Sequence, residues 1–282
     1  MNGPSISRRS FLALSAMLPL AVRGRAKKTI PIGLELYSVR NELKKDAAAT
    51  VRAVAQMGYK CVEFFSPYSE WTEGQAKDMR KLLDDLGIRC FSTHNSSTQI
   101  SPENIGHARD LNLILGATYV LVASAKPKPG ADGWLAVAET LNYAAEQLQP
   151  AGLKTGYHNH KVEFLPVEGR RPIEILAEKT KPSVALQLDV GTCLEAGGDP
   201  VAWIRANPGR IRSIHCKDWS PDTAKGYGVL FGEGAADWKN IFQAAETVGG
   251  TEYYLIEQEG SRFSELETAE KCLASYRKIR PA

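Results

Sequence analysis

Cysteine is sparse in this 282-residue chain, and the spacing of the few cysteines does not indicate a disulfide-stapled fold. The five residues form no CxxC pair and no dense framework: Cys61, Cys90, Cys193, Cys216 and Cys272. If the protein is exported, an odd number of cysteines leaves at least one thiol without a disulfide partner. We therefore expect the cysteines to serve as packing residues.

A hydrophobic run long enough to cross a membrane is also missing. The apolar run Phe11–Val22 has about 12 residues, which is too short for the ~30 Å of bilayer hydrocarbon. It follows the adjacent arginines Arg8 and Arg9, and a small-x-small cleavage site lies at 24–26. This arrangement predicts a twin-arginine signal peptide over residues 1–26 and an exported, periplasmic protein with no membrane association after processing. The alternative is a buried N-terminal helix with arginines at both ends.

Excess charge of one sign disappears when this segment is set aside. The predicted signal contains four arginines and no acidic residue, so its removal changes the formal net charge from +3 to −1. A near-neutral chain without a cluster of basic residues argues against a nucleic-acid partner and against phosphorylated substrates.

The remaining chain alternates eight short apolar stretches with eight amphipathic stretches. The apolar stretches, predicted to be strands, are 30–39, 60–65, 88–94, 118–124, 153–159, 184–190, 210–216 and 252–258. The amphipathic stretches, predicted to be helices, are 46–57, 72–86, 102–115, 132–149, 170–180, 199–206, 237–248 and 263–278. This order predicts one domain over 27–282, a single (β/α)₈ TIM barrel. A glycine-rich phosphate turn after the first strand, typical of doubly wound sheets, is absent.

Residues suited to chemistry gather at the carboxyl ends of the predicted strands, where such barrels place their active sites. They are Glu63, His94, His158, His160, Asp189, His215, Lys217 and Glu257. Each residue alone has an ordinary explanation as a helix cap or a hydrogen-bonded core residue. Four consecutive strands, however, supply His, Asp, His and Glu, and this oxygen and nitrogen set suits a divalent ion such as Mn²⁺, Zn²⁺, Fe²⁺ or Co²⁺. We therefore predict a metal site at this rim.

The motifs around these residues resemble the sugar phosphate isomerase/epimerase family, which belongs to the xylose isomerase-like TIM barrels. The matching motifs are "GLELYSVRNEL", "GYKCVEFF", "GYHNHKVEF", "LQLDVGTCLEAGGDP", "IRSIHCKDW", "FGEGAADW" and "YLIEQEG". They extend from about Ile30 to the C-terminus. The same superfamily includes tagatose 3-epimerases, inosose dehydratases and an apurinic-site endonuclease.

The resemblance implies one divalent ion, with Mn²⁺ as the first choice and Zn²⁺, Co²⁺, Fe²⁺ or Mg²⁺ as alternatives. The family's epimerases hold it with Glu, Asp, His and Glu on strands 5 to 8, which by motif gives Asp189, His215 and Glu257 here. His158 stands where the family has the strand-5 glutamate. The implied ligand set is therefore His158, Asp189, His215 and Glu257. His160 would line the substrate pocket, although the two histidines could exchange roles.

The family resemblance also implies the class of reaction. We expect a metal-dependent isomerase/epimerase or lyase that removes the α-proton of a keto-sugar or keto-glycoside and forms a metal-stabilised enediolate. Because His158 replaces a glutamate base, a one-base reaction fits better than a symmetric epimerisation, and dehydratase or glycoside-lyase chemistry is included. The catalytic candidates are Glu257, His160, Glu163 and Lys217.

Three further residues are predicted to contact substrate: His94, Trp219 and Glu63. Two of them have a structural alternative: Glu63 could form an ion pair within the barrel, and Trp219 could be a packing residue. The catalytic candidate Lys217 has one as well, an ion pair with Asp189 or Glu257. Two other functions stay open, a catalytically silent metal-containing sugar-binding barrel and, less favoured, an apurinic-site endonuclease. A homo-oligomer is neither required nor excluded.

Overall fold

The computed structural model describes residues 29–280, and these residues form one closed barrel. The predicted signal peptide, residues 1–26, lies outside the described residues. Within the described part of the chain, no helix is both long and apolar enough to cross a membrane.

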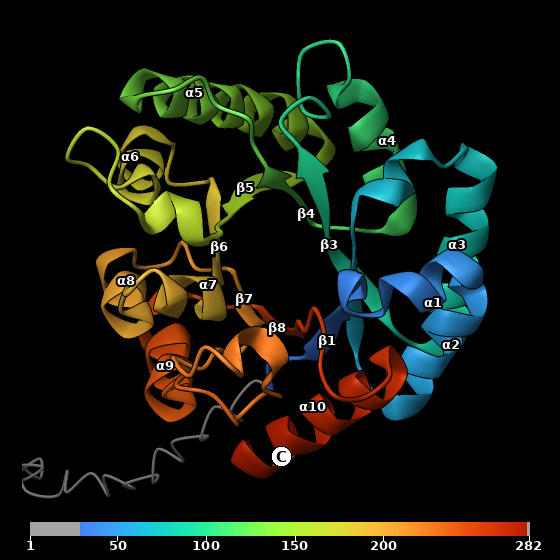
Figure 1. Ribbon diagram of the computed structural model, residues 1–282. Helices are drawn as coiled ribbons and strands as arrows, with labels where there is room; N and C mark the ends of the chain where they lie inside the picture. The colour runs from blue at the N-terminus through green and yellow to red at the C-terminus, as the bar shows by residue number, and fades with distance from the viewer. Residues whose placement is uncertain (1–28, 281–282) are drawn as a thin grey trace, which may run out of the picture.

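Eight parallel strands follow one another around the barrel in chain order, and β8 closes on β1 (Figure 1). The strands are β1 Ile32–Glu35, β2 Cys61–Phe64, β3 Arg89–Ser96, β4 Tyr119–Ser124, β5 Lys154–His158, β6 Ala185–Asp189, β7 Ser213–Cys216 and β8 Tyr253–Ile256. The α-helices are α1 Arg40–Lys45, α2 Ala47–Met57, α3 Glu73–Leu86, α4 Ile105–Leu115, α5 Ala131–Leu148, α6 Pro172–Lys179, α7 Val190–Glu195, α8 Pro200–Ala206, α9 Trp238–Ala244 and α10 Glu265–Ile279. The predicted TIM barrel is confirmed.

The interior of the barrel is layered, because alternate residues of each strand point inward. One layer is apolar and consists of Cys61, Tyr119, Leu121, Ala185, Tyr253 and Leu255, with Phe91 packed against it. Two residues after Cys61, Ala185 and Leu255 lie Glu63, Gln187 and Glu257, the last directly beyond the end of β8. The apolar layer therefore forms the floor on which the polar layer rests.

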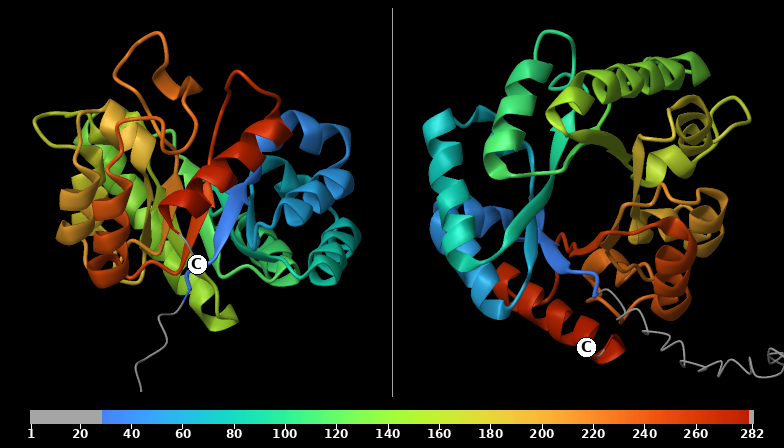
Figure 2. Two further views of the ribbon diagram at one scale, coloured as in Figure 1. Left: turned by 90° about the horizontal axis from the view of Figure 1, so that it is seen from below. Right: turned by 180° about the vertical axis from the view of Figure 1, so that it is seen from behind.

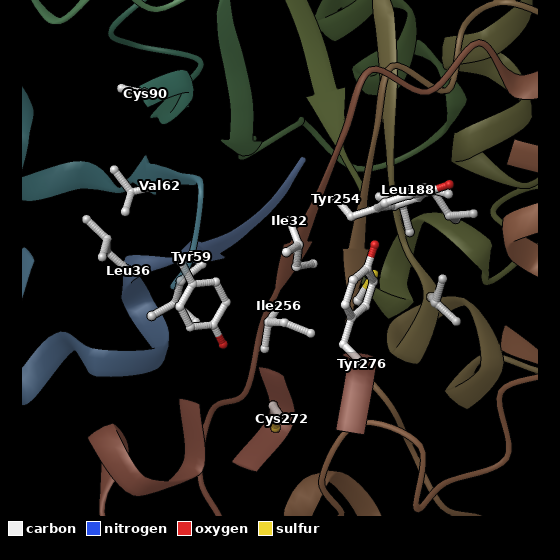
Figure 3. Packing of buried hydrophobic residues seen from close by; sticks show 14 of the residues in the cluster. Ile32, Leu36, Tyr59, Val62, Cys90, Leu188, Tyr254, Ile256, Cys272 and Tyr276 are labelled. Carbon is white, nitrogen blue, oxygen red and sulfur yellow. The ribbon is translucent and has the colours of Figure 1, made fainter. Parts of the chain in front are cut away.

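The main hydrophobic core lies outside the barrel, between the strands and the helices. Figure 3 shows part of it, where Cys272 and Tyr276 of α10 face Ile256 and Tyr254 of β8. The hydroxyl of buried Tyr59 donates to the Ala269 carbonyl oxygen of α10 over 2.7 Å. This packing fixes α10 against the sheet and so fixes the loop that leads from β8 into the helix.

The observed elements differ from the predicted ones mainly at the strand ends. The predicted first strand, 30–39, stops at Glu35, because the Glu35 carboxylate accepts from the Tyr37 amide over 2.5 Å and closes a 3₁₀ turn over Leu36–Val39. Helices α1 and α7 were not predicted; α1 directly follows the 3₁₀ turn Leu36–Val39, and α7 directly follows β6. The predicted helix 237–248 ends as an α-helix at Ala244 and continues as a π-helix to Gly249.

All five cysteines are buried and free.

The loops after β7 and β8 rise at the same end of the barrel in the side view (Figure 2, left, orange and red). This end carries the carboxyl ends of all eight parallel strands. The candidate site lies here.

Candidate metal centre

Four side chains from consecutive strands converge at this end of the barrel: His158, Asp189, His215 and Glu257. One ligand atom from each of them lies within 4.8 Å of the others, and all four residues are buried. His158 and Asp189 end β5 and β6, His215 lies within β7, and Glu257 follows β8 directly. The structure thus brings together the four residues that the sequence predicted as metal ligands.

Asp189 has one oxygen in use and one without a hydrogen-bond partner. Its Oδ1 accepts from the Thr192 amide over 2.9 Å and caps the N-terminus of α7. Its Oδ2 is buried without a hydrogen bond, and it lies 3.7 Å from the Lys217 ammonium nitrogen and 4.0 Å from His158 Nε2. Burial raises the pKa of this carboxyl, although Lys217 opposes the rise. A buried anionic oxygen that accepts no hydrogen bond costs free energy, and a metal cation in contact with it would reduce that cost.

His215 is held between two carboxylates. Its Nδ1 lies 2.5 Å from Glu257 Oε2, and its Nε2 lies 2.7 Å from Glu63 Oε1. Burial alone would lower the pKa of His215, but the carboxylates of Glu63 and Glu257 hold it well above the ordinary histidine value. Binding of a metal ion at this imidazole must therefore displace a proton.

His158 has the opposite electrostatic environment. Burial lowers its pKa well below the ordinary value, and His215 and His94 contribute in the same direction. The rings of His94 and His215 lie 4.5 and 4.4 Å from the His158 ring, centroid to centroid. A neutral imidazole is the form that ligates a metal, so His158 is ready to bind one.

Lys217 supplies the buried positive charge of the site. Its Nζ lies 3.3 Å from Glu257 Oε1, also pairs with Glu259, and lies 4.8 Å from the centre of the Tyr227 ring. Burial would lower the pKa of this amine, but Glu257, Asp189 and Glu259 hold it well above the ordinary lysine value. The predicted ion-pair alternative for Lys217 is therefore present, and the ammonium stays charged beside the cluster.

The residues present fit a divalent cation. The buried Asp189 Oδ2 has no hydrogen-bond partner, the four candidate ligands are close enough to share one ion, and two imidazoles with two carboxylates form a ligand set suited to Zn²⁺, Mn²⁺ or Fe²⁺. No sulfur ligand is involved.

The substrate candidates occupy different positions. Glu63 is completely buried and makes ion pairs inside the barrel, with His215 and with His94 Nε2 at 3.0 Å. Burial alone would raise the pKa of Glu63, but His94 and His215 hold this pKa well below the ordinary glutamate value. His94 is only slightly exposed, and Trp219 is half-buried in the loop after β7.

His160 and Glu163 do not occupy equivalent positions. His160 is exposed at the rim, and its ring centre lies 4.9 Å from that of His158, so it borders the cluster. Glu163 is buried, and its carboxylate accepts from the Tyr157 hydroxyl and from the His160 amide, each over 2.7 Å. Tyr157 packs against Trp134 outside the barrel. The structure therefore places Glu163 behind His160, as a brace for its backbone, rather than with the other catalytic candidates.

Two polar residues of the cluster were not among the predicted site residues. Gln187 contacts both His94 and His158, and Glu35 has a buried Oε1 without a hydrogen-bond partner. Burial raises the pKa of Glu35, and the nearby carboxylates of Glu257 and Glu63 add to the rise. A signal for Gln187 was present, because it lies two residues before Asp189 on the same strand and so faces the same way.

Asp218, next to Lys217, anchors the loop that covers one side of the site. Its buried carboxylate accepts five hydrogen bonds of 2.9–3.2 Å, from the amides of Trp219, Gly232, Gly234 and Ala236 and from the Trp238 indole. A Cβ on Gly234 would lie only 2.1 Å from Asp218 Oδ1, so glycine is needed for this close approach. The glycines of "FGEG", residues 231–234, thus approach a carboxylate of the chain itself.

We predict that Asp218→Asn lowers the free energy of unfolding by about 3 kcal/mol. The amide would turn an NH₂ group toward N–H donors and leave at least two of them without an acceptor, at about 1–3 kcal/mol each. Urea unfolding measures the change. Asp222→Asn is the matched control, because Asp222 is exposed and its carboxylate has two partners at the surface, the Ala224 amide and the Lys225 ammonium at 3.5 Å. It should stay within about 0.5 kcal/mol of wild type, and an equal loss in both variants would contradict the anchoring role.

Comparison with known proteins agrees with the fold. The family model for the xylose isomerase-like TIM barrel matches residues 51–279. The chain therefore belongs to the xylose isomerase-like TIM barrel family.

Individual relatives are distant. The rhizopine catabolism protein MocC of Rhizobium meliloti is 26% identical over 239 residues, which cover 72% of each chain. An inosose dehydratase of Geobacillus thermodenitrificans is 24% identical over 233 residues, covering 77% of this chain and 72% of that one. A solved sugar phosphate isomerase/epimerase from Parabacteroides distasonis is 27% identical, with a TM-score of 0.76 over 94% of this chain and 99% of that one.

Proposed function

We propose that this protein is a divalent-metal-dependent enzyme that removes the α-proton of a non-phosphorylated polyhydroxy ketone and then eliminates a β-substituent. The observation that carries the proposal is the buried cluster of His158, Asp189, His215 and Glu257, in which Asp189 Oδ2 has no hydrogen-bond partner. These four residues would hold the ion. When bound, a divalent ion supplies Lewis acidity toward a carbonyl oxygen and its neighbouring hydroxyl.

The positions of the side chains favour His160 over Glu257 as the base that removes the α-proton. Both oxygens of Glu257 already have charged partners, His215 at 2.5 Å and Lys217 at 3.3 Å, so this carboxylate is held as a ligand. His160 is exposed beside the cluster, and Glu163 fixes its backbone. The His160 imidazole would take the α-proton, and the C–H electron pair would form the enediolate double bond. The Lys217 ammonium would stabilise the negative oxygen.

The second half of the reaction is an elimination. The enediolate electrons would expel the substituent on the β-carbon. This group would take up the proton held by the His160 imidazolium and leave as water or as an alcohol, so that the product is an unsaturated ketone and His160 is neutral again. The replacement of a glutamate by His158 removes one of the two opposed bases that a symmetric epimerisation needs. The similarity to an inosose dehydratase also supports elimination over epimerisation.

Proton exchange in D₂O tests the proposal. The mature chain, reconstituted with Mn²⁺ or Zn²⁺, is incubated with ketohexoses and with keto-glycosides, and ¹H NMR follows the α-proton. We expect loss of the α-proton signal together with an unsaturated product that absorbs in the ultraviolet. Exchange that yields only an epimer would support the isomerase branch over elimination, whereas tight metal and sugar binding without exchange would identify a catalytically silent binding barrel.

We further propose that residues 1–26 direct export, so that the substrate is a sugar of the periplasm. Support comes from the twin arginines and the short apolar run. Cell fractionation of wild type beside an Arg8→Lys, Arg9→Lys variant tests this, and the variant should stay in the cytoplasm.

A further inference from the structure

We propose that Gln187 is a positioning residue that decides which nitrogen of His158 is free to bind the metal. The inference rests on the proposed metal-dependent function. It concerns a residue on β6 that would not itself be a ligand. Its buried amide makes four hydrogen bonds.

The Gln187 amide lies in the centre of the cluster and contacts four other strands. Its side chain is 1% exposed. Its Oε1 lies 2.8 Å from His94 Nε2 and 2.9 Å from His158 Nδ1. Its Nε2 donates to Glu63 Oε2 and to Ser213 Oγ, each over 3.0 Å. All four hydrogen-bonding positions that the amide uses are therefore fixed by partners from β2, β3, β5 and β7.

The Glu63 carboxylate sets the orientation of this amide. Glu63 is surrounded by donors: its Oε1 faces the Nε2 atoms of His215 and His94, and its Oε2 accepts from the Ser92 hydroxyl. The oxygens of a carboxylate in this position only accept hydrogen bonds. The Gln187 NH₂ group must therefore face Glu63. The opposite orientation would place an amide oxygen 3.0 Å from a carboxylate oxygen. It follows that Gln187 Oε1 faces the two imidazoles.

The orientation of the amide then sets the tautomer of His158. An amide oxygen can only accept, so the His158 nitrogen that faces it, Nδ1, must carry the proton. In a neutral imidazole, the other nitrogen then has a lone pair. That nitrogen, Nε2, lies 4.0 Å from the unpartnered Asp189 Oδ2. The lone pair and the free carboxylate oxygen are thus available to the same ion.

The same amide explains why His94 differs from His158, although the two rings are neighbours. His94 faces Gln187 Oε1 and Glu63 Oε1 with the same nitrogen, Nε2, and both of these atoms are acceptors. The proton on His94 therefore lies on Nε2, and this nitrogen is occupied. The hydrogen bonds of Gln187 thus leave His158 Nε2 available to bind the metal, whereas His94 Nε2 is used as a hydrogen-bond donor.

The test uses the full mature chain, with ¹⁵N-labelled histidine, and compares wild type with Gln187→Met. Two-bond ¹H–¹⁵N NMR spectra identify the protonated nitrogen of each histidine, in chelated and in Zn²⁺-loaded protein, and titration gives the Zn²⁺ affinity. We expect the Nδ1–H tautomer of His158 in wild type. In Gln187→Met we expect a mixture of tautomers and a 10–100-fold weaker Zn²⁺ affinity, the usual effect of losing a partner that orients a metal ligand.

Two more variants separate this role from a general loss of buried hydrogen bonds. Gln258→Met removes another buried amide, whose hydrogen bonds run to backbone atoms of Tyr227, Val229 and Gly260 instead of to histidines. It should keep the His158 tautomer and the Zn²⁺ affinity. Gln187→Glu keeps an acceptor oxygen for His158 and loses the donor to Glu63, so it should keep the Nδ1–H tautomer.

The outcomes distinguish this inference from the proposed function. A wild-type His158 protonated on Nε2 would overturn the inference, and so would a Gln187→Met protein with wild-type tautomer and affinity. If wild type showed the Nδ1–H tautomer but bound neither Zn²⁺ nor Mn²⁺, the metal-dependent function would be wrong while the tautomer assignment would stand.

Discussion

Asp189→Asn is expected to reduce divalent-metal affinity by more than about 100-fold and to reduce turnover in proportion. Even partners that only orient a metal ligand contribute about 10–100-fold in affinity, and Asp189 would be a ligand itself. The asparagine keeps a side-chain oxygen for the Thr192 amide, so the cap of α7 survives. It removes the anionic Oδ2 that has no hydrogen-bond partner. Isothermal titration with Mn²⁺ or Zn²⁺ measures the loss.

The metal-free Asp189→Asn protein should be at least as stable as metal-free wild type. A buried charge without a hydrogen bond costs free energy, and its removal offsets the loss of one partner of Lys217, which keeps Glu257 and Glu259. Asp199→Asn is the matched control, because Asp199 caps α8 through bonds to Val201 and Ala202 and is exposed. It should keep full metal affinity. An Asp189→Asn protein that retained its metal and its activity would contradict the assignment.

His160→Gln is expected to slow α-proton exchange by about 10²–10⁴-fold, the usual contribution of a positioned general base. The glutamine keeps the backbone amide that donates to Glu163 and has no basic nitrogen. Since His160 is not among the four candidate ligands, metal affinity should stay within about threefold of wild type. The measurement is the rate of deuterium incorporation into the ketone with saturating metal.

His107→Gln is the control for this substitution, because His107 is an exposed histidine of α4 that bonds to the Ser69 carbonyl oxygen over 2.9 Å. It should exchange the α-proton at the wild-type rate. Wild-type exchange in His160→Gln with intact metal binding would exclude His160 as the base and leave Glu257 as the candidate.

The barrel and its polar rim could be predicted from the sequence because both follow from short-range patterns. Strand ends were visible as polar residues that follow apolar runs, and parallel strands place such ends on one rim. His158, Asp189, His215 and Glu257 could therefore be grouped before any contact was known. The hydrogen-bond partners of these four residues could not be predicted in the same way, because they depend on the register between strands. His215 lies between Glu63 and Glu257 only because strands far apart in the chain are staggered as they are.

Other features depend on contacts that no local pattern reveals. Glu163 follows β5 closely and looked like a pocket residue, yet its carboxylate turns back to Tyr157 and the His160 amide. Gln187 was not among the predicted site residues: its position on the same face as Asp189 follows from the strand, but its four partners on other strands do not. Such roles arise from tertiary packing, so the sequence alone could not rank these two residues correctly.

The most direct test of the central claim is the metal content of the purified mature chain, wild type beside His158→Ala, measured by inductively coupled plasma mass spectrometry after dialysis. The account predicts one divalent ion per wild-type chain and a clear loss in His158→Ala. Wild type without a stoichiometric ion, or an ion retained unchanged in His158→Ala, would contradict it.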